Sequence, residues 1–318
     1  MLLNVENLSI SIGAHPIVRD ISFSVDYGQS VGIVGESGCG KSITALAIMG
    51  LLEYTQITVT DGAVCFNGRN LLDLSVRERR ALMGSQMAMI FQEPMSSLNP
   101  VYVVGEQIVE MIRQHEKVSA KSARARARTL LKMVHVPDPA GRFHSYPHQL
   151  SGGMRQRVMI AIALACSPDL LIADEPTTAL DVTVQSQILA LLRELQSETG
   201  MAMILVSHDL AVIAENCQTV AVMYRGGIVE YAPTTALFAS ARHRYTVALM
   251  KLIPNARAPV VKLAAIPGRV PAAGETISGC AFHPRCDRTD EICKQHSPEA
   301  RGENGHIVRC HHPHGERR

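Results

Sequence analysis

The first part of the chain alternates apolar and polar positions in short runs. Runs of this kind cover residues 2–34 and continue over residues 57–66 and 68–74. Alternation with a period of two predicts strands with one buried face. The pairs Asp61-Gly62 and Asn67-Gly68 are turn signals. We therefore predict a small antiparallel sheet in the N-terminal part of the chain.

Continuous apolar runs, which are typical of buried strands, form a second pattern. They cover residues 30–34, 87–91, 169–174 and 201–206. The first is followed by an apolar segment of helix length at residues 43–52, and residues 95–165 are rich in helix formers. Buried strands that alternate with helices predict an α/β fold.

Composition places the chain among globular proteins. It has 318 residues, of which 47% are apolar and 19% charged, enough to bury a core of about two domains. The net charge of +2, the absence of Trp and an aromatic content of 4% argue against a nucleic-acid partner. The N-terminus lacks signal-peptide features, and no apolar run approaches the ~18 residues that span a bilayer. We expect a cytosolic chain that serves a membrane only through another protein.

The strand at residues 30–34 runs directly into a glycine-rich loop that fits the phosphate-binding pattern G-x-x-x-x-G-K-[ST]. In such a loop the glycines let backbone N–H groups face an anion, and the following helix points its N-terminus at the phosphates. Lys41 would reach the β- and γ-phosphates, and the Ser42 hydroxyl would bind Mg²⁺. The predicted ATP-binding residues here are Gly35, Glu36, Ser37, Gly38, Cys39, Gly40, Lys41, Ser42 and Ile43.

The other apolar runs also end on polar side chains. Gln92 follows the run at residues 87–91, Asp174 ends the run at residues 169–174, and Glu175 comes directly after it. One carboxylate in this position can hold the Mg²⁺ of a nucleotide, and a second can deprotonate a water. His208 follows the last run; a lone histidine there is more often structural, but beside the other residues it becomes a candidate γ-phosphate contact.

A second glycine pair opens another predicted helix. The segment is Leu150-Ser151-Gly152-Gly153-Met154. A helix N-terminus of this kind suits an anion, although the signal alone is weak.

Together and in this order, these motifs resemble the ATP-binding subunit of an ABC transporter over roughly the first 240 residues. The resemblance implies that two such subunits close two ATP molecules between them. Each ATP would lie between the phosphate loop of one subunit and the signature segment 150–154 of the other, with Asp181 in the adjoining loop. Ser42, Gln92 and Asp174 would hold Mg²⁺, Glu175 would activate water, and His208 would contact the γ-phosphate.

Two positions of the nucleotide site depart from the family pattern. The family stacks adenine on an aromatic ring upstream of the phosphate loop, and the position that aligns there is His15, whose imidazole buries less surface. Cys39 stands at a variable position of the loop. We interpret it as a substitution without a role, with an oxidation-sensitive thiol as the weaker alternative.

The last eighty residues resemble the C-terminal extension of dipeptide and oligopeptide importer ATPases, through segments 242–249, 267–271 and 279–286. Four cysteines crowd this tail, and a cysteine cluster in a cytosolic chain favours metal ligation over disulfides. Their spacing matches the pattern with which some members bind a [4Fe–4S] cluster. Tetrahedral zinc is compatible with the same spacing. The predicted ligands are Cys280, Cys286, Cys293 and Cys310.

The sequence thus predicts an α/β fold with an ABC-type phosphate-loop ATPase core. We expect an ATPase domain over residues 1–240, with an antiparallel β subdomain and a helical subdomain at about 95–165, and a small metal-binding extension over 241–318. The predicted function is ATP hydrolysis that powers an importer of di- or oligopeptides.

The expected partners follow from the resemblance. They are two transmembrane permease subunits, a second and paralogous ATPase subunit, and an extracytoplasmic solute-binding protein, with the chain on the cytoplasmic face of the inner membrane. The alternatives are an importer for nickel or another non-peptide solute and a soluble ABC-type ATPase that acts on nucleic acid or ribosomes. The single set of motifs and the absence of sustained heptads disfavour the latter.

Overall fold

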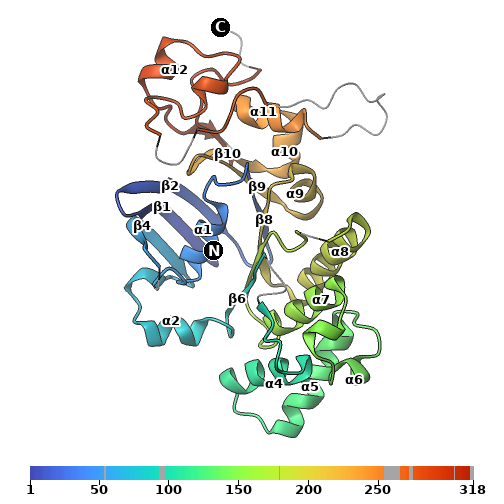
Figure 1. Cartoon of the computed structure of the whole chain (residues 1–318). Helices are drawn as coiled ribbons and strands as arrows, with labels where there is room; N and C mark the ends of the chain where they lie inside the picture. The colour runs from blue at the N-terminus through green and yellow to red at the C-terminus, as the bar shows by residue number, and fades with distance from the viewer. Residues whose placement is uncertain are drawn as a thin grey trace.

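Two β-sheets organise the chain, as Figure 1 shows for the computed structural model. The structure describes residues 1–53, 55–92, 97–178, 180–253, 266–271, 275–303 and 305–315. A four-stranded sheet has the order β2-β1-β4-β5, and an eight-stranded sheet has the order β11-β12-β10-β9-β3-β8-β7-β6. The predicted α/β architecture with a separate N-terminal sheet is confirmed.

The four-stranded sheet is antiparallel, as the alternating pattern predicts. Its strands are β1 (Leu3–Ile12), β2 (His15–Val25), β4 (Ile57–Phe66) and β5 (Arg69–Asn70). Asn67-Gly68 forms the predicted turn between β4 and β5. The prediction of a turn at Asp61-Gly62 is wrong. Both residues lie inside β4, where a register shift against β1 bends the strand and Gly62 takes a φ of 95°.

The core of the larger sheet consists of five parallel strands. They are β9 (Thr219–Tyr224), β3 (Ser30–Val34), β8 (Ala202–Ser207), β7 (Leu170–Asp174) and β6 (Met87–Ile90). Successive residues of β7 face two different hydrophobic cores: Leu170 and Ile172 pack toward the N-terminal sheet, and Leu171 and Ala173 pack toward the helices. Burial on both faces explains the continuous apolar runs.

Antiparallel strands extend this sheet beyond β9. β10 (Gly227–Pro233) forms a hairpin with β9, and two short strands from the C-terminal tail follow, β12 (His306–Val308) and β11 (Arg301–Glu303). The tail is therefore joined to the main sheet by backbone pairing of Glu230 with Val308. The sequence patterns did not predict this addition.

Helices cover the face of the parallel strands opposite the N-terminal sheet and form a layer of their own at one end of the molecule (Figure 1). The layer contains α4 (Val104–His115), α5 (Ala120–Met133), α6 (Pro139–Arg142) and α7 (Gly152–Ala163). The remaining helices are α1 (Lys41–Ile48), α2 (Val76–Leu82), α8 (Val182–Thr199), α9 (Leu210–Asn216), α10 (Thr234–Ala239), α11 (Arg244–Met250) and α12 (Glu291–Gln295), with short 3₁₀ turns η1 (Leu71–Asp73), η2 (Pro147–Gln149) and η3 (His283–Arg285). In the described part of the chain, no helix combines the length and the apolar character that a bilayer crossing requires.

Candidate functional site

The glycine-rich loop connects β3 to α1, in the strand–loop–helix order that the sequence predicts. Lys41, the first residue of α1, is 4% exposed, and its Nζ donates hydrogen bonds to the carbonyls of Gly35 at 2.8 Å and Glu36 at 3.3 Å. The loop therefore folds around the ammonium group of its own lysine. This places a buried positive charge at a helix N-terminus, and the charge and the helix N-terminus each attract phosphate.

Gly40 shows why the loop requires glycine. It precedes α1 with a φ of 104°, a conformation that side chains with a Cβ rarely adopt. A Cβ at this position would also lie 3.1 Å from Val18 of β2. The N-terminal sheet thus runs alongside the phosphate loop. The predicted adenine contact, His15, is exposed at the start of the same strand.

Ser42 and Asp174 meet beside the loop. The Ser42 hydroxyl donates a hydrogen bond of 3.0 Å to Oδ1 of Asp174, which ends β7. Burial raises the pKa of the Asp174 carboxyl, and the hydrogen bond from Ser42 acts in the opposite direction. A hydroxyl and a buried carboxylate at this spacing provide two oxygen ligands for a hard cation such as Mg²⁺.

Glu175 is the centre of a second group of polar contacts. Its Oε2 accepts hydrogen bonds from Nε2 of Gln92 at 3.1 Å and from the hydroxyl of Thr178 at 2.9 Å, and it lies 3.4 Å from Nδ1 of His208. Its φ is 44°, in the left-handed region, and its N–H donates to the carbonyl of Val206. A non-glycine residue held in this conformation is a frequent feature of functional sites.

The structure therefore brings together residues that the sequence places far apart. Gln92, Glu175 and His208 follow three neighbouring strands, β6, β7 and β8, at the edge where all three end. A cavity of about 250 Å³ adjoins Glu175 and His208, and the imidazole of His208 is 61% exposed. Thr178 begins the loop that the resemblance places between Glu175 and Asp181, but its hydroxyl was assigned no role from the sequence.

The signature segment lies in a different part of the molecule. Ser151 and Gly152 are exposed at the start of α7, and the Ser151 hydroxyl accepts a hydrogen bond from the N–H of Met154. Figure 1 shows α7 well apart from α1. A Cβ at Gly153 would lie 2.7 Å from Val184 of α8, a helix that the Asp181 carboxylate caps. Leu150 is buried, so the segment is anchored in the core while Ser151 and Gly152 stay exposed at the N-terminus of α7.

The four tail cysteines converge on one small cavity. Burial raises the pKa of each thiol, that of Cys280 to about 11. Among the described residues, the group of ligand atoms that all lie within 4.8 Å of one another is Asp290, Cys293 and His312, which includes only one of the four sulfurs.

The N-terminal half of the chain decides its family. The family profile described as "ABC transporter" matches residues 18–178, and the profile described as "Oligopeptide/dipeptide transporter, C-terminal region" matches residues 229–293. The chain belongs to the ABC transporter ATP-binding family. The tail segment of this ABC ATPase thus has a family match of its own.

Relatives match this ABC ATPase over nearly its whole length. The dipeptide transport ATP-binding protein DppD of Escherichia coli (strain K12) is 48% identical over 98% of this chain and 97% of the relative. The oligopeptide transport ATP-binding protein OppD of the same organism is 44% identical over 98% of this chain and 93% of the relative. A solved dimeric structure of the ATP-binding cassette MJ0796 with ADP and Pi is 28% identical over 73% of this chain and 99% of that chain, with a TM-score of 0.65.

Proposed function

We propose that this ABC ATPase is the subunit that hydrolyses ATP to power an importer of dipeptides or oligopeptides. The observation that carries the proposal is the convergence of Gln92, Asp174, Glu175 and His208 beside the phosphate loop, in a chain whose tail matches the peptide-transporter region. Relatives named for dipeptide and for oligopeptide transport match almost the full chain and support the same solute class.

The contacts of Glu175 suggest how water is activated. Three neighbouring side chains converge on its Oε2, and among the described residues its Oε1 makes no hydrogen bond. The carboxylate is thus oriented through one oxygen, which leaves the other to accept a proton from water. Mg²⁺, when bound with ATP, neutralises phosphate charge, and Ser42 and Asp174, with Gln92 nearby, would hold it.

A second ATPase subunit is required to complete this site. The signature residues Ser151 and Gly152 are exposed and lie away from the phosphate loop of their own chain. An exposed helix N-terminus that binds phosphate must then act on a nucleotide held by another subunit. The dimeric solved relative supports this arrangement. Whether the partner is a paralogue or a second copy, the same two surfaces are used.

We further propose that a permease helix docks in an apolar cavity of about 560 Å³ between α4, α7 and β6. Its lining is unusually rich in methionine, an adaptable side chain for binding another protein. Phe91, which is 41% exposed at the cavity, directly precedes Gln92, whose amide contacts Glu175. A permease segment bound in this cavity would contact Phe91, the neighbour of the residue that binds Glu175. The methionines are Met49, Met83, Met89, Met111 and Met159.

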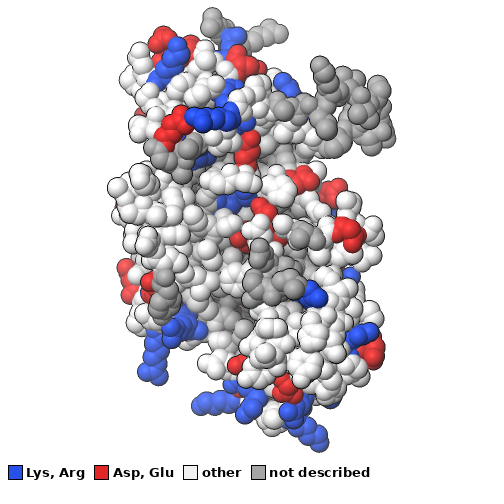
Figure 2. Space-filling view, in the orientation of Figure 1, with Lys and Arg blue, Asp and Glu red and all other residues white. Residues whose placement is uncertain are grey.

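The charge distribution suits attachment to the cytoplasmic face of the inner membrane. Figure 2 shows blue side chains gathered at the end of the molecule that carries α2, α4 and α5. The exposed cations there include Arg77 and Arg80 of α2 and Lys121 of α5, and Arg124 of α5 pairs with Glu106 of α4. Lys and Arg near a bilayer are attracted by anionic headgroups. The same end of the molecule carries the methionine-rich cavity, so this end would contact both the permease and the membrane.

We propose that the four tail cysteines hold a [4Fe–4S] cluster. In a zinc site, a Zn–S bond of about 2.3 Å would bring the sulfurs to about 3.8 Å from one another. The four sulfurs line one small cavity, and no three of them lie within 4.8 Å of one another. Four thiolates around one point are the donor set that a [4Fe–4S] cluster takes. Burial and the neighbouring cysteines raise the pKa of these thiols, and bound iron would stabilise their thiolate forms. Zinc held by Asp290, Cys293 and His312 is the alternative that metal analysis would reveal.

Peptide uptake tests the proposed function. Cells that lack this chain should fail to take up radiolabelled dipeptides or pentapeptides, and the wild-type chain should restore uptake. Lys41→Ala, which removes the buried ammonium of the phosphate loop, should not restore it. Normal peptide uptake without this chain, or loss of nickel uptake alone, would assign the ATPase to another solute.

A further inference from the structure

The C-terminal extension reaches back to the phosphate loop. Arg285 donates two hydrogen bonds to the Glu36 carboxylate, from Nη1 to Oε2 at 2.6 Å and from Nη2 to Oε1 at 3.1 Å. This two-point pairing joins residues that are 249 positions apart, and the Arg285 side chain is only 4% exposed. A planar guanidinium that pairs with both carboxylate oxygens fixes direction as well as distance.

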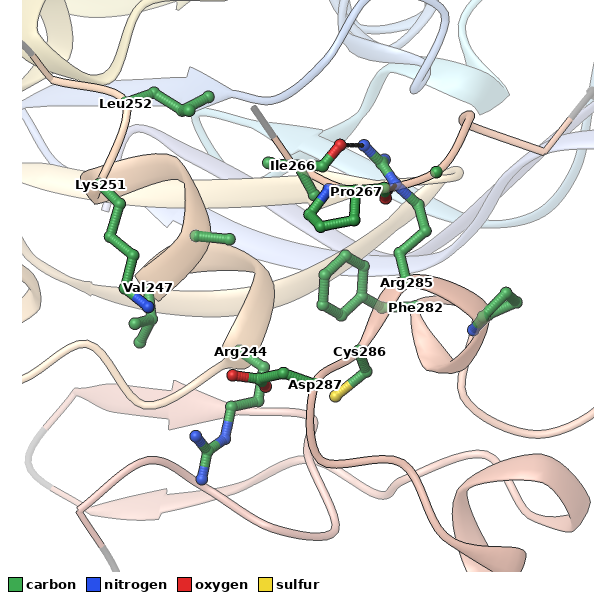
Figure 3. Close-up of a pocket in the computed structure, with 13 residues that line it drawn as sticks. Arg244, Val247, Lys251, Leu252, Ile266, Pro267, Phe282, Arg285, Cys286 and Asp287 are labelled. Atoms are coloured by element: carbon green, nitrogen blue, oxygen red, sulfur yellow. Dashed lines mark hydrogen bonds between the residues drawn. The ribbon is translucent and has the colours of Figure 1, made fainter. Parts of the chain in front are cut away.

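The rest of the extension holds Arg285 rigidly. Its Nε donates to the carbonyl of Pro267 at 3.0 Å and its Nη2 to that of Ile266 at 3.3 Å. Figure 3 shows Arg285 extended toward Ile266 and Pro267, beside Phe282, at a cavity of about 500 Å³. The guanidinium carbon also lies 6.0 Å from the ring centre of Tyr224. The orientation of the Arg285 guanidinium is therefore fixed by contacts other than its pairing with Glu36.

Tyr245 of α11 binds the backbone of Glu36. Its hydroxyl accepts a hydrogen bond of 2.9 Å from the N–H of Glu36. Tyr245 is completely buried, with ring centres 4.7 Å from Tyr224 and 5.4 Å from Phe282. The extension therefore contacts Glu36 at both the backbone and the carboxylate.

Glu36 in turn organises the loop. Its carbonyl accepts hydrogen bonds from Nζ of Lys41 and from the N–H of Cys39, both at 3.3 Å. Any displacement of Glu36 would move the carbonyl that orients the lysine and closes the turn of the loop. A phosphate-binding loop binds well only when its donors are already in place, because ordering them on binding costs affinity.

We propose that Arg285 and Tyr245 are positioning residues for nucleotide binding, which act through Glu36 and make the extension a structural part of the ATP site. The inference rests only on the nucleotide-binding part of the proposed function. It does not depend on the solute or on which metal the tail holds. A purely local role, in which these contacts only attach the tail to the core, predicts different results.

The test is titration of the purified full-length chain with a fluorescent ATP analogue and Mg²⁺. Tyr245→Phe keeps the buried ring and removes the hydroxyl, so we expect the Kd to rise about threefold to tenfold, as for the loss of one hydrogen bond. Arg285→Met should raise the Kd about tenfold or more, and Arg285→Lys should restore part of the affinity. In the assembled transporter, KM for ATP should rise while kcat at saturating ATP stays within about twofold.

Arg309→Met is the matched control. Arg309 also joins the tail to the core, through a 2.8 Å ion pair with Asp20 of β2, but it does not contact the loop. Its variant should bind the analogue like wild type. Equal Kd values for Tyr245→Phe, Arg309→Met and wild type would overturn the inference. If Arg285→Met does not fold, the Kd of Tyr245→Phe decides the test. Failure of the wild-type chain to bind the analogue would overturn the proposed function itself.

Discussion

Replacement of Glu175 by glutamine separates the chemistry of this residue from its structural contacts. In the structure Oε2 takes part in all its polar side-chain contacts, accepting from Gln92 and Thr178 and approaching His208. The amide oxygen of Glu175→Gln can occupy the position of Oε2 and keep these contacts. The amide nitrogen then takes the position of Oε1, where it donates and cannot accept a proton from water.

The size of the effect follows from this substitution. Loss of a positioned general base slows reactions by about 10²- to 10⁴-fold. At about 1.36 kcal/mol for each tenfold change, this corresponds to about 2.7–5.4 kcal/mol in the activation barrier. Nucleotide binding should stay close to wild type because the contacts of Lys41 and Ser42 are unchanged. ATP-bound dimers should therefore accumulate.

Steady-state phosphate release and size-exclusion chromatography with ATP measure the two consequences. Glu194→Gln removes the same charge from an exposed residue of α8 and should hydrolyse ATP at the wild-type rate. Hydrolysis by Glu175→Gln within about twofold of wild type would remove Glu175 from the role of base.

Three further predictions concern the signature, the tail metal and the attachment of the tail. Ser151→Arg should abolish hydrolysis in the assembled transporter but leave the ATP affinity of the isolated chain unchanged. Ser119→Arg, which alters the N-cap of α5, controls for the loss of a helix cap. Weaker ATP binding by the isolated Ser151→Arg chain would contradict action across the dimer. Anaerobically purified protein should be brown, with iron and acid-labile sulfide in about equal amounts. Cys286→Ser should lose both and Cys166→Ser neither, whereas one equivalent of zinc would overturn the cluster. Glu230→Ala should lower the free energy of unfolding by roughly 3 kcal/mol, because the buried carboxylate accepts from the N–H groups of Arg242 and His243 and contacts His306. Thermal unfolding measures this, and a change below about 0.5 kcal/mol would refute it.

The parts of the site that could be predicted from sequence are those that local chain order determines. A phosphate loop must lie between a strand and a helix, so Gly35 to Ser42 are placed by their neighbours alone. The sequence could predict that Gln92, Asp174 and His208 lie close together, because each stands at or just after the end of an apolar run that forms a strand. The turn expected at Asp61-Gly62 was wrong because a glycine inside a long twisted strand permits a bulge as well as a turn.

The features that were missed depend on distant contacts or on very short elements. Nothing near Glu36 in sequence indicates that Arg285 pairs with it, since the two are 249 positions apart. The strands β11 and β12 have three residues each, too few to show a period of two. The left-handed backbone of Glu175 is likewise imposed by the surrounding strands rather than by its own preferences.

Peptide-stimulated ATP hydrolysis tests the central claim most directly. The complete transporter can be purified from native membranes by a tag on this chain, then supplied with its solute-binding protein. We predict that dipeptides or oligopeptides raise the rate of phosphate release, and that the same complex with Glu175→Gln shows no such rise. A rate that peptides leave unchanged while another solute raises it, or an equal rise with Glu175→Gln, would contradict the account.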